Sequence, residues 1–590
     1  MHLSENARKV LEARYLRRDM QGKLNETPDQ IFARVASAIA YAELLLGNRE
    51  QAALWEDRFH TLLTSLDFLP NSPTLMNAGT PLGQLSACFV LPIDDSVESI
   101  FTALHDMALI QRTGGGTGFS FGRLRPLGDL IASTGGTSSG ALSFLRVFDC
   151  ATENIKVGGK RRGANMGVLT VDHPDILSFI EAKRTARSLT NFNLSVGITD
   201  TFMAAVEHND LYDIRHPATG KTVDRLNARE VFQRIVEAAW ATGDPGLLFL
   251  DTINRTHPLH SLGRIEATNP CGEVPLLPYE SCNLGSINLS QFVREDHDAV
   301  AVDWPRLADV TQQAVRFLDD VLVVNRYPMP QIEAVSLASR KIGLGVMGFA
   351  ELLIRLGIPY KSKEALSFAV QLIQFIAREA RQASAALAAE RGVFPLWAQS
   401  IYAQQGMPMR NATTTSIAPT GTISIIADTS SSIEPLFALS YRRVGVLDNQ
   451  QLTEWNPLLL THGERMGFIT PEILDHVARY GTLAGAHGVP DQVRDLFATA
   501  LEIEPLQHLL MQANFQSAVD NAVSKTINLP AEITPDSVAT IFKQAYHLGL
   551  KGITIYRYGS IAGQVLQLGI DEEPYEKEQT SRCDPYQCKL

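Results

Sequence analysis

A thiol, a side-chain amide and a carboxylate lie within five residues near the middle of the sequence. Asn269, Cys271 and Glu273 alternate there with Pro270 and Gly272. Proline fixes its own φ and restrains the residue before it, while glycine permits turn geometry, so the segment predicts a tight loop with the thiol at its tip. One interpretation is a buried cysteine in a proline-rich loop. The other is a thiol that performs redox or nucleophilic chemistry beside a carboxylate base, which the symmetric placement of amide and carboxylate favours.

Five further cysteines accompany Cys271. Cys282 follows it by eleven positions, and Cys88 lies in an apolar run over residues 85–91 that is typical of a strand. Cys583 and Cys588 lie beyond an acidic, weakly apolar segment. They could be half of a zinc site, but no second Cys or His pair is nearby, so a dithiol on a tether that carries reducing equivalents explains them better. Cys150, in a predicted helix over 141–157, is interpreted as a packed core thiol.

The whole chain limits the classes of function. It has 590 residues, 45% of them hydrophobic, which is ample for a large core, and a net charge of −12. The acidic balance disfavours nucleic-acid binding. No secretory segment and no apolar run long enough to span a bilayer is found in the sequence, so we expect no membrane association and a reducing cytosolic compartment. Cysteines there are more often catalytic or metal-binding than paired in structural disulfides.

Loops rich in glycine, hydroxyl and basic residues punctuate the chain. The glycine run at 112–123 matches neither a P-loop nor a dinucleotide fingerprint, so a flexible turn is favoured. The basic turn at 158–163 is equally compatible with a solvated surface turn and with a phosphate contact, and the hydroxyl-rich turn at 416–426 could bind phosphate. The sequence from Thr27 to Gln30 predicts the capped start of a helix. Short apolar runs that alternate with long helices favour an α/β fold with parallel strands.

Taken together, these motifs resemble one family. The Asn-x-Cys-x-Glu segment at 269–273, Cys88 in Ser-Ala-Cys-Phe-Val, Cys282 and the Pro-Thr-Gly-Thr turn at 419–422 are similar to the catalytic subunit of ribonucleotide reductase. The resemblance covers essentially the whole chain, to Arg557. It implies an α/β barrel of ten strands in two five-stranded parallel halves, with Cys271 on a central finger loop. The expected domains are an N-terminal helical region at 1–65, the barrel at 66–560 and a mobile redox tail at 561–590.

The resemblance also implies a role for each catalytic residue. Cys271 would become a thiyl radical that takes the 3′ hydrogen of the ribose, Glu273 would act as base on the 3′ hydroxyl, and Asn269 would hydrogen-bond the sugar hydroxyls. Cys88 and Cys282 would supply a proton and two electrons as the 2′ hydroxyl leaves as water, and would end as a disulfide. The Cys583 and Cys588 pair would then reduce that disulfide, itself served by a thioredoxin-like reductant.

Nucleotide sites carry over position by position. The ribonucleotide substrate would be lined by Ser72, Ser86, Gly116, Thr420, Gly421 and Thr422. A deoxynucleotide triphosphate effector would be bound by Asp95, Ser96, Val97 and Arg125. Residues 182–191 would relay effector identity to the substrate base. The chain has no room for a separate N-terminal ATP-binding domain and no large insertion between residues 95 and 167, so a homodimer with effectors at its interface is expected.

Several short sequence motifs resemble those of the adenosylcobalamin-dependent branch of the family. They include the short interval between Cys271 and Cys282 and the replacement of the second of two radical-relay tyrosines by Arg557. The paired cysteines of the tail look more like the branch that uses a metal-containing radical partner, which is one alternative; a catalytically dead nucleotide sensor is another. No histidine-based cobalamin motif and no protein metal site is expected. Whether diphosphates or triphosphates are reduced stays open.

Overall fold

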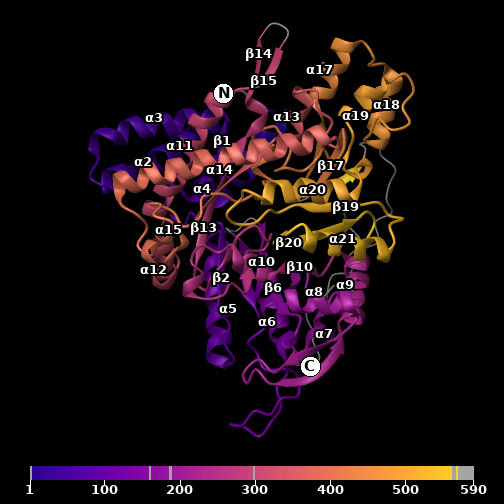
Figure 1. Cartoon of the computed structure of the whole chain (residues 1–590). Coiled ribbons are helices and arrows are strands. Elements are labelled where there is room, and N and C mark those ends of the chain that lie inside the picture. Colours follow the sequence, from indigo (N-terminus) through magenta and orange to yellow (C-terminus); the bar gives the residue numbers. More distant parts are fainter. Residues whose placement is uncertain are drawn as a thin grey trace. The chain divides into compact units, whose positions relative to one another are not determined.

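The computed structural model describes residues 3–157, 161–184, 189–296, 299–447, 450–560 and 566–568. The described residues between 3 and 437 and between 500 and 560 form one compact unit, and those between 438 and 499, with 566–568, form another. The first unit contains all the sequence-predicted site residues that the structure describes. Its helices and strands are labelled in Figure 1.

The N-terminal region is helical, as the sequence predicts. It consists of α1 (Glu5–Arg14), α2 (Pro28–Leu45) and α3 (Arg49–Thr64). The predicted capping box is present at the start of α2, because Gln30 N donates to Thr27 Oγ1 (3.3 Å) and Thr27 N donates to Gln30 Oε1 (2.9 Å). These reciprocal bonds satisfy backbone donors that the helix itself leaves unpaired. The domain boundaries at 65 and 560 stay a prediction.

Five strands make the first half of the barrel. They are parallel throughout, in the order β2 (Cys88–Leu91), β3 (Gly116–Ser120), β6 (Asn165–Thr170), β7 (Phe192–Ile198) and β10 (Gly246–Phe249). The intervening helices include α5 (Val97–Arg112), α6 (Ala141–Asn154), α8 (Asp200–His208) and α9 (Ala228–Thr242). Strand, helix and parallel strand alternate because a parallel pair needs a crossover connection.

The second half has the same parallel character but one irregular member. β13 (Ser281–Asn288) pairs with β16 (Ile342–Met347), and β19 (Thr526–Leu529) pairs with β20 (Gly552–Arg557). Residues 413–417 lie between these pairs: Leu344 forms a parallel bridge to Thr415, and Ile417 forms one to Val523. This segment therefore supplies the fifth parallel element of the half.

Antiparallel seams join the two halves. β2 pairs with β13 at one seam, and β10 pairs with β20 at the other. The ten-stranded sheet contains the nine named strands of both halves and β1 (Phe68–Pro70), which pairs with β13 from outside. Together with the bridges of residues 413–417, these pairings close the sheet on itself. The predicted ten-stranded α/β barrel in two parallel halves is confirmed.

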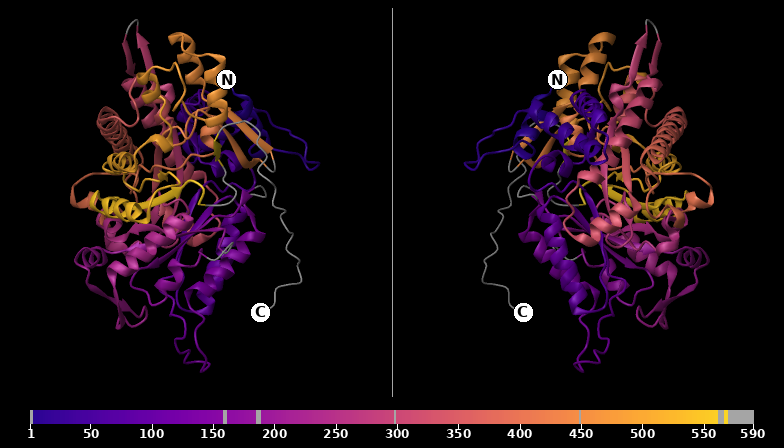
Figure 2. Two further views of the ribbon diagram at one scale, coloured as in Figure 1. Left: turned by 90° about the vertical axis from the view of Figure 1, so that its right-hand side faces the viewer. Right: turned by 90° about the vertical axis from the view of Figure 1, so that its left-hand side faces the viewer.

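Helices cover the outside of the barrel (Figure 2). On the second half these are α11 (Trp304–Val324), α14 (Lys363–Arg391), α20 (Pro505–Gln516) and α21 (Pro535–His547). α11 packs on β13 and β16, and α20 packs on β19 (Figure 1). Fully buried phenylalanines, among them Phe119, Phe148 and Phe192, fill the layer between the first half and its helices. Among the described residues no helix is both long and apolar enough to cross a membrane.

Two sequence interpretations are wrong. The glycine run is not a flexible turn at residues 116–120, because they form strand β3, where glycine makes room for the backbone of Thr268. Cys150 is not a core thiol but is exposed. Leu145, Phe148 and Thr152 hold one buried face of α6, and Cys150 falls on the opposite face at the 3.6-residue period.

The second unit carries none of the predicted site residues that the structure describes. Its described residues form a hairpin, β17 (Ser440–Leu447) with β18 (Gln450–Trp455), the short β21 (Leu566–Leu568) and three helices. The helices are α17 (Pro457–Met466), α18 (Pro471–Tyr480) and α19 (Asp491–Leu496).

Candidate active site

The segment around Cys271 forms a finger. β11 (Ala267–Thr268) and β12 (Pro275–Leu276) pair antiparallel, and the loop between them is closed by Asn269 N, which donates to Val274 O (3.3 Å). Gly272 has φ +81°, a conformation that a residue with a side chain rarely adopts. The predicted tight loop, with Cys271 at its tip and no helix, is therefore present.

Both halves of the barrel hold the finger from inside. Ser416 Oγ and Ala522 N, from the second half, each donate to Glu273 O at 2.9 Å. Asn193 Nδ2, on β7 of the first half, donates to Pro270 O (2.8 Å). A Cβ built on Gly118 would lie 1.7 Å from Thr268 O, so only glycine allows β3 to approach the finger this closely. The glycine run of the sequence thus creates space for the catalytic loop.

Cys88 and Cys282 lie opposite each other across the seam of the barrel. They are Cα partners in the antiparallel register of β2 and β13, both are buried, and both are free thiols. Directly opposed residues on antiparallel strands have Cβ atoms about 4.5–5.5 Å apart, close to the span of a disulfide. The two thiols that the resemblance paired are therefore neighbours, although 194 residues separate them in the sequence.

Asn269 connects the finger to this thiol pair. Its Nδ2 donates to Cys88 Sγ (3.1 Å), and its Oδ1 accepts from Val274 N (3.0 Å). Glu273 is 3% exposed, and its Oε2 has no hydrogen-bond partner among the described residues. A buried carboxylate oxygen left unpaired is costly, so the position suits a group that meets a ligand's hydroxyl. Amide, carboxylate and two thiols thus converge behind the finger tip.

Burial dominates the protonation of this cluster. It raises the pKa of Glu273 to about 7, against the opposing effect of the Asn269 side chain. Burial, followed by the Glu273 charge, raises the pKa of the Cys88 and Cys271 thiols well above the usual range. The thiols therefore stay protonated near neutral pH, which suits hydrogen-atom or proton transfer better than a standing thiolate.

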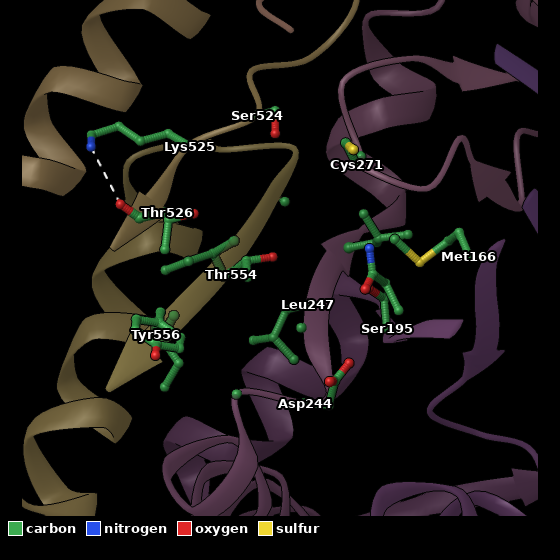
Figure 3. A pocket seen from close by; sticks show the side chains of 18 of the residues that line it. Met166, Ser195, Asp244, Leu247, Cys271, Ser524, Lys525, Thr526, Thr554 and Tyr556 are labelled. Atoms are coloured by element: carbon green, nitrogen blue, oxygen red, sulfur yellow. Dashed lines mark hydrogen bonds between the residues drawn. The ribbon is translucent and has the colours of Figure 1, made fainter. Parts of the chain in front are cut away.

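A cavity of about 470 Å³ opens on the other side of the finger tip. Figure 3 shows Cys271 facing it from one wall with Met166 and Ser195, and Lys525, Thr554 and Tyr556 on the opposite wall. Cys271 is thus exposed to this cavity although protein surrounds it densely elsewhere. Of the five predicted catalytic residues, all within the described ranges, Cys271 alone lines it.

The charged groups of the cavity wall are paired. Lys525 is buried and donates to Glu434 Oε2 (2.5 Å), and Asp244 accepts from Lys183 Nζ (2.9 Å). Hydroxyls and backbone make up most of the remaining polar surface, and Gly243, Gly246, Gly272 and Gly552 are among the lining residues. Sequence reasoning missed this cavity, because its walls come from segments between residues 166 and 556 that carry no common motif.

The predicted substrate residues lie in one unit but on different elements: Ser72 begins α4 (Ser72–Asn77), Gly116 begins β3, and Ser86 and the turn at 420–422 lie in loops. Ser72 Oγ bonds Tyr15 OH (2.7 Å), and Ser86 Oγ accepts from Asn325 Nδ2 (3.0 Å). Thr420, with φ +55°, accepts from Ser432 N at its Oγ1 (2.7 Å), and the turn continues into α16 (Ile423–Ile426). None of the six predicted substrate residues, Ser72, Ser86, Gly116, Thr420, Gly421 and Thr422, lines the cavity of Figure 3.

The predicted effector residues lie together at the start of α5. Arg125 Nε donates to Asp95 Oδ2 (2.8 Å), and Arg125 N donates to Asp95 Oδ1 (3.1 Å). Ser96 caps α5 through its hydroxyl, which accepts from Ser99 N (3.1 Å), and Val97 is 62% exposed. The structure thus brings all four residues to one surface position.

Part of the predicted machinery lies outside the described residues. Cys583 and Cys588 do so, as do residues 185–188 of the predicted relay segment and residues 158–160 of the basic turn.

Sequence reasoning also missed a buried ion pair beside the thiols. Lys341 Nζ donates to Glu280 Oε2 (2.5 Å), and Glu280 lies two residues before Cys282. The available signal in the sequence was one charged residue directly before each of two buried strands, Glu280 before β13 and Lys341 before β16.

Comparison with known proteins agrees with this fold. Residues 86–556 match the family described as ribonucleotide reductase, barrel domain, and residues 1–83 match ribonucleotide reductase, all-alpha domain. The chain belongs to the ribonucleotide reductase large-subunit family.

Three similar proteins illustrate the match. The chain is 53% identical to the vitamin B12-dependent ribonucleoside-diphosphate reductase of Mycobacterium tuberculosis (strain CDC 1551), over 96% of this chain and 81% of that protein. It is 48% identical to the protein of the same name from Thermoplasma acidophilum, over 98% and 82%. The solved class Id ribonucleotide reductase alpha subunit of Actinobacillus ureae superposes with a TM-score of 0.77 at 24% identity, over 94% of this chain and 97% of that one, which supports the fold alone.

Proposed function

We propose that this protein reduces ribonucleoside diphosphates to 2′-deoxyribonucleotides by thiyl-radical chemistry with adenosylcobalamin as its cofactor. The observation that carries the proposal is the placement of Cys271. Its thiol faces a cavity on one side of the finger, while Asn269, Glu273 and the Cys88–Cys282 pair lie on the other side. A radical can thus reach the thiol from one side and be used on the other. The names of the relatives at 48% and 53% identity support both the diphosphate substrate and the cofactor.

The residues divide the chemistry as follows. Cys271 takes the 3′ hydrogen of the ribose, and Glu273 accepts the 3′ hydroxyl proton, which its unpaired Oε2 is free to do. Asn269 orients the sugar hydroxyls and keeps its bond to Cys88. Cys88 and Cys282 give one proton to the departing 2′ hydroxyl, which leaves as water, and give the second proton and two electrons to the sugar, so that C2′ gains a hydrogen and a disulfide forms. Cys271 then returns the 3′ hydrogen, and Glu273 returns the proton of the 3′ hydroxyl. The buried site excludes water from the radical.

The cavity of Figure 3 fits the cofactor by its chemistry. Its wall reaches Cys271 and its charged residues are already paired, so it suits a mostly uncharged part of a cofactor placed next to that thiol. When bound, adenosylcobalamin supplies the radical equivalent that converts the Cys271 thiol into a thiyl radical. No histidine is among the described lining residues, so the group would be held without a histidine ligand.

Arg557 argues against a radical partner chain. The family branch that uses such a partner has two adjacent tyrosines here, whereas this chain has Tyr556 followed by Arg557. The Arg557 guanidinium lies 4.2 Å from the centre of the Trp240 ring, and its Nε donates to Trp240 O (2.9 Å). A cation fixed on an indole cannot relay a radical by losing a hydrogen atom. Tyr556 lines the cavity but has no adjacent tyrosine from which to receive a radical.

Regulation and assembly follow from the surface near α5. Asp95, Ser96, Val97 and Arg125 would bind a deoxynucleoside triphosphate. Apolar side chains are exposed beside them: Val97 (62%) and Phe101 (49%) on α5, and Leu127 (67%) and Leu130 (66%) on the following loop. An exposed apolar patch next to an effector site suits a homodimer interface. A thioredoxin-like reductant, the Cys583–Cys588 relay and a cytosolic location complete the proposal.

The test is reduction of a ribonucleoside diphosphate by the purified chain with adenosylcobalamin and a small dithiol, without a second protein. We expect multiple turnovers, and none for Cys271→Ser, which should still bind effector. Activity only after addition of a metal-containing radical subunit would favour the partner-dependent enzyme. Effector binding without any turnover would favour a nucleotide sensor, although such a protein would have no use for three thiols around one amide.

A further inference from the structure

The buried Lys341 sits beside the redox thiol pair on the side of Cys282. Lys341 immediately precedes β16, and Cys282 is the second residue of β13. Asn283 and Ile342 are partners in the parallel register of the two strands, which places Cys282 and Lys341 one step earlier at the same level. Neighbouring strands lie about 4.8 Å apart, and residues at one level point to the same face. Asn283 points outward, since its Nδ2 donates to Leu318 O on α11, so Cys282 and Lys341 point inward.

Lys341 is held there by a buried network. Its side chain is fully inaccessible, and its Nζ donates to Glu280 Oε2 (2.5 Å) and lies 3.3 Å from His257 Nε2. Glu280 Oε2 also accepts from Leu277 N (2.7 Å). Burial, followed by the charge of Lys341, lowers the pKa of His257 to about 2. The imidazole is therefore neutral, and its Nε2 accepts a hydrogen bond from the Lys341 ammonium. The ammonium thus has two side-chain partners and cannot turn away from the thiols.

The charge of Lys341 distinguishes the two thiols. Burial raises the pKa of Cys282, Glu273 and Glu280 add to that effect, and Lys341 opposes it. Burial also raises the pKa of Cys88, and Glu273, Cys282 and Cys271 add to that effect. The hydrogen bond that Cys88 receives comes from Asn269, which is an uncharged amide. A negative charge on sulfur is therefore better compensated on Cys282 than on Cys88.

We infer that Lys341 sets the direction in which the Cys88–Cys282 disulfide is reduced, by stabilising Cys282 as the leaving thiolate so that the incoming dithiol attacks Cys88. The attacking thiolate forms a mixed disulfide with Cys88 Sγ while the bond to Cys282 Sγ breaks and its electron pair stays on Cys282. The second thiol of the dithiol then attacks the mixed disulfide and releases Cys88. Two electrons pass from the dithiol, which ends as a disulfide, and the two enzyme thiolates take up the two protons it loses. A thiol of lower pKa leaves faster, which gives the ammonium its effect on direction.

Lys341 is in this sense a positioning residue, and the inference deepens the proposed function because it concerns recovery of the same thiol pair. Its test does not need turnover. The full-length chain carrying Cys271→Ser, Cys583→Ser and Cys588→Ser is oxidised with diamide, reacted briefly with N-acetylcysteine and quenched in acid. Peptide mapping then gives the ratio of adduct on Cys88 to adduct on Cys282. We expect a several-fold excess on Cys88.

Variants of the ion pair separate an electrostatic role from a structural one. Lys341→Met should bring the ratio close to one, and Lys341→Arg should restore it. Glu280→Gln should raise the ratio above that of the unsubstituted background, because it removes the charge that competes for Lys341. Damage to packing alone would move Lys341→Met and Glu280→Gln in the same direction. Lys525→Met is the matched control: Lys525 is also buried and also pairs with a carboxylate, that of Glu434, but it lies in the wall of the cavity of Figure 3 and not in the Lys341 network, so its removal should leave the ratio unchanged.

Several outcomes would overturn the inference. One is a predominant adduct on Cys282 in the unsubstituted background, and another is an unchanged ratio in Glu280→Gln. The adduct ratio of Glu280→Gln tests the inference even if Lys341→Met fails to fold, which is a risk because removal of one partner of a buried pair is strongly destabilising. Failure of diamide to form a Cys88–Cys282 disulfide would show that these two thiols are not a redox pair. Absence of ribonucleotide turnover in the unmodified enzyme, with the adduct ratios as expected, would contradict the proposed function and not this role of Lys341.

Discussion

Cys88 and Cys282 face each other across the antiparallel seam that joins the two halves of the barrel, and Asn269 donates to the sulfur of the first. The thiol pair therefore belongs to the barrel wall, whereas Cys271 belongs to the finger inside it. This separation lets the pair change between dithiol and disulfide without moving Cys271, because the finger is tied to other segments by Ser416 and Asn193.

The first prediction concerns this pair. One turnover without reductant should leave Cys88 and Cys282 linked, because opposed residues at an antiparallel seam are within disulfide range. Peptide mapping after a single turnover, with alkylation of free thiols, measures the link. Cys150, exposed and far along the chain, is an internal control that should stay free. Recovery of both Cys88 and Cys282 as free thiols would contradict their role as the electron source.

The second prediction is a pH dependence set by Glu273. Its pKa of about 7 means that the folded protein keeps a proton that the unfolded chain loses near pH 4.5. Between these values the folded state binds more protons, so this residue's contribution to stability is complete below about pH 4.5 and is lost as pH rises through 7, by about 3 kcal/mol. Catalysis runs the other way, because the base must be ionised, and kcat/KM should rise with pH up to about 7.

Two measurements check this behaviour. Thermal unfolding of the native protein and of Glu273→Gln from pH 4.5 to 8 should show that the variant loses less stability with rising pH. The kcat/KM profile of the native enzyme should have its lower inflection near pH 7. An inflection near pH 4.5, together with parallel stability curves, would mean that Glu273 titrates as an ordinary exposed carboxylate.

The fold could be predicted from the sequence further than the site could. The alternation of apolar runs with helices and the resemblance in motifs predict the barrel, and the capping box at Thr27 predicts the start of α2. Residues 413–417 could not be identified as a strand, because four of the five are hydroxyl residues without an apolar pattern and they complete the barrel through two isolated bridges, Leu344 to Thr415 and Ile417 to Val523. Whether Cys150 is buried depends on which face of α6 it occupies, and the sequence alone did not determine that face. The role of the glycine run became clear only from its contact with the finger.

Contacts between distant segments explain the rest. The sequence pattern names Cys88 and Cys282, but only the register of β2 and β13 makes them neighbours. The ion pair of Lys341 and Glu280 joins two strand starts, and the cavity that Cys271 faces is built from segments of both barrel halves. Local patterns carry no information on such juxtapositions, because they arise from closure of the sheet.

The third prediction tests the effector site. Asp95→Ala should weaken deoxynucleotide binding about 10- to 100-fold, because hydrogen bonds to charged groups contribute about 1.5–3 kcal/mol. The Asp95–Arg125 pair is partly exposed, so its loss should barely change Tm. Equilibrium binding of a labelled deoxynucleotide and the dimer fraction are the measurements. Asp94→Ala removes an adjacent carboxylate that pairs with Arg123 and is the control; equal effects of both substitutions would make the site nonspecific.

The fourth prediction concerns the tail. Cys583→Ser/Cys588→Ser should turn over normally with a small dithiol, which reaches the Cys88–Cys282 disulfide by itself. With a thioredoxin as reductant the same variant should stop after about one turnover, because exchange through the tail is lost. Turnover number with each reductant, measured beside zinc content, separates this shuttle from a metal clip. Sustained thioredoxin-driven turnover in the double variant would exclude the shuttle.

The last prediction concerns the space that β3 leaves for the finger. A Cβ on Gly118 would lie 1.7 Å from Thr268 O, and that atom belongs to the backbone of the hairpin, which cannot rotate aside as a side chain can. In Gly118→Ala the hairpin must therefore move, and Cys271 moves with it. Overpacking of this kind costs about 1–3 kcal/mol, so the barrel should still fold. A displacement of about 1 Å at a reacting group costs about 100-fold in rate, so kcat should fall by about that factor while effector binding is kept.

Gly136→Ala is the matched control, since its Cβ would meet only Thr134 Oγ1, at 3.5 Å. It lies in an exposed loop and should change neither kcat nor Tm. Melting curves, kcat and the alkylation rate of Cys271 distinguish a displaced finger from an unfolded barrel: displacement alters the alkylation rate and kcat with a small change in Tm. Native kcat in Gly118→Ala would show that the finger can shift without consequence, and the position of Cys271 would then not be set by its contact with β3.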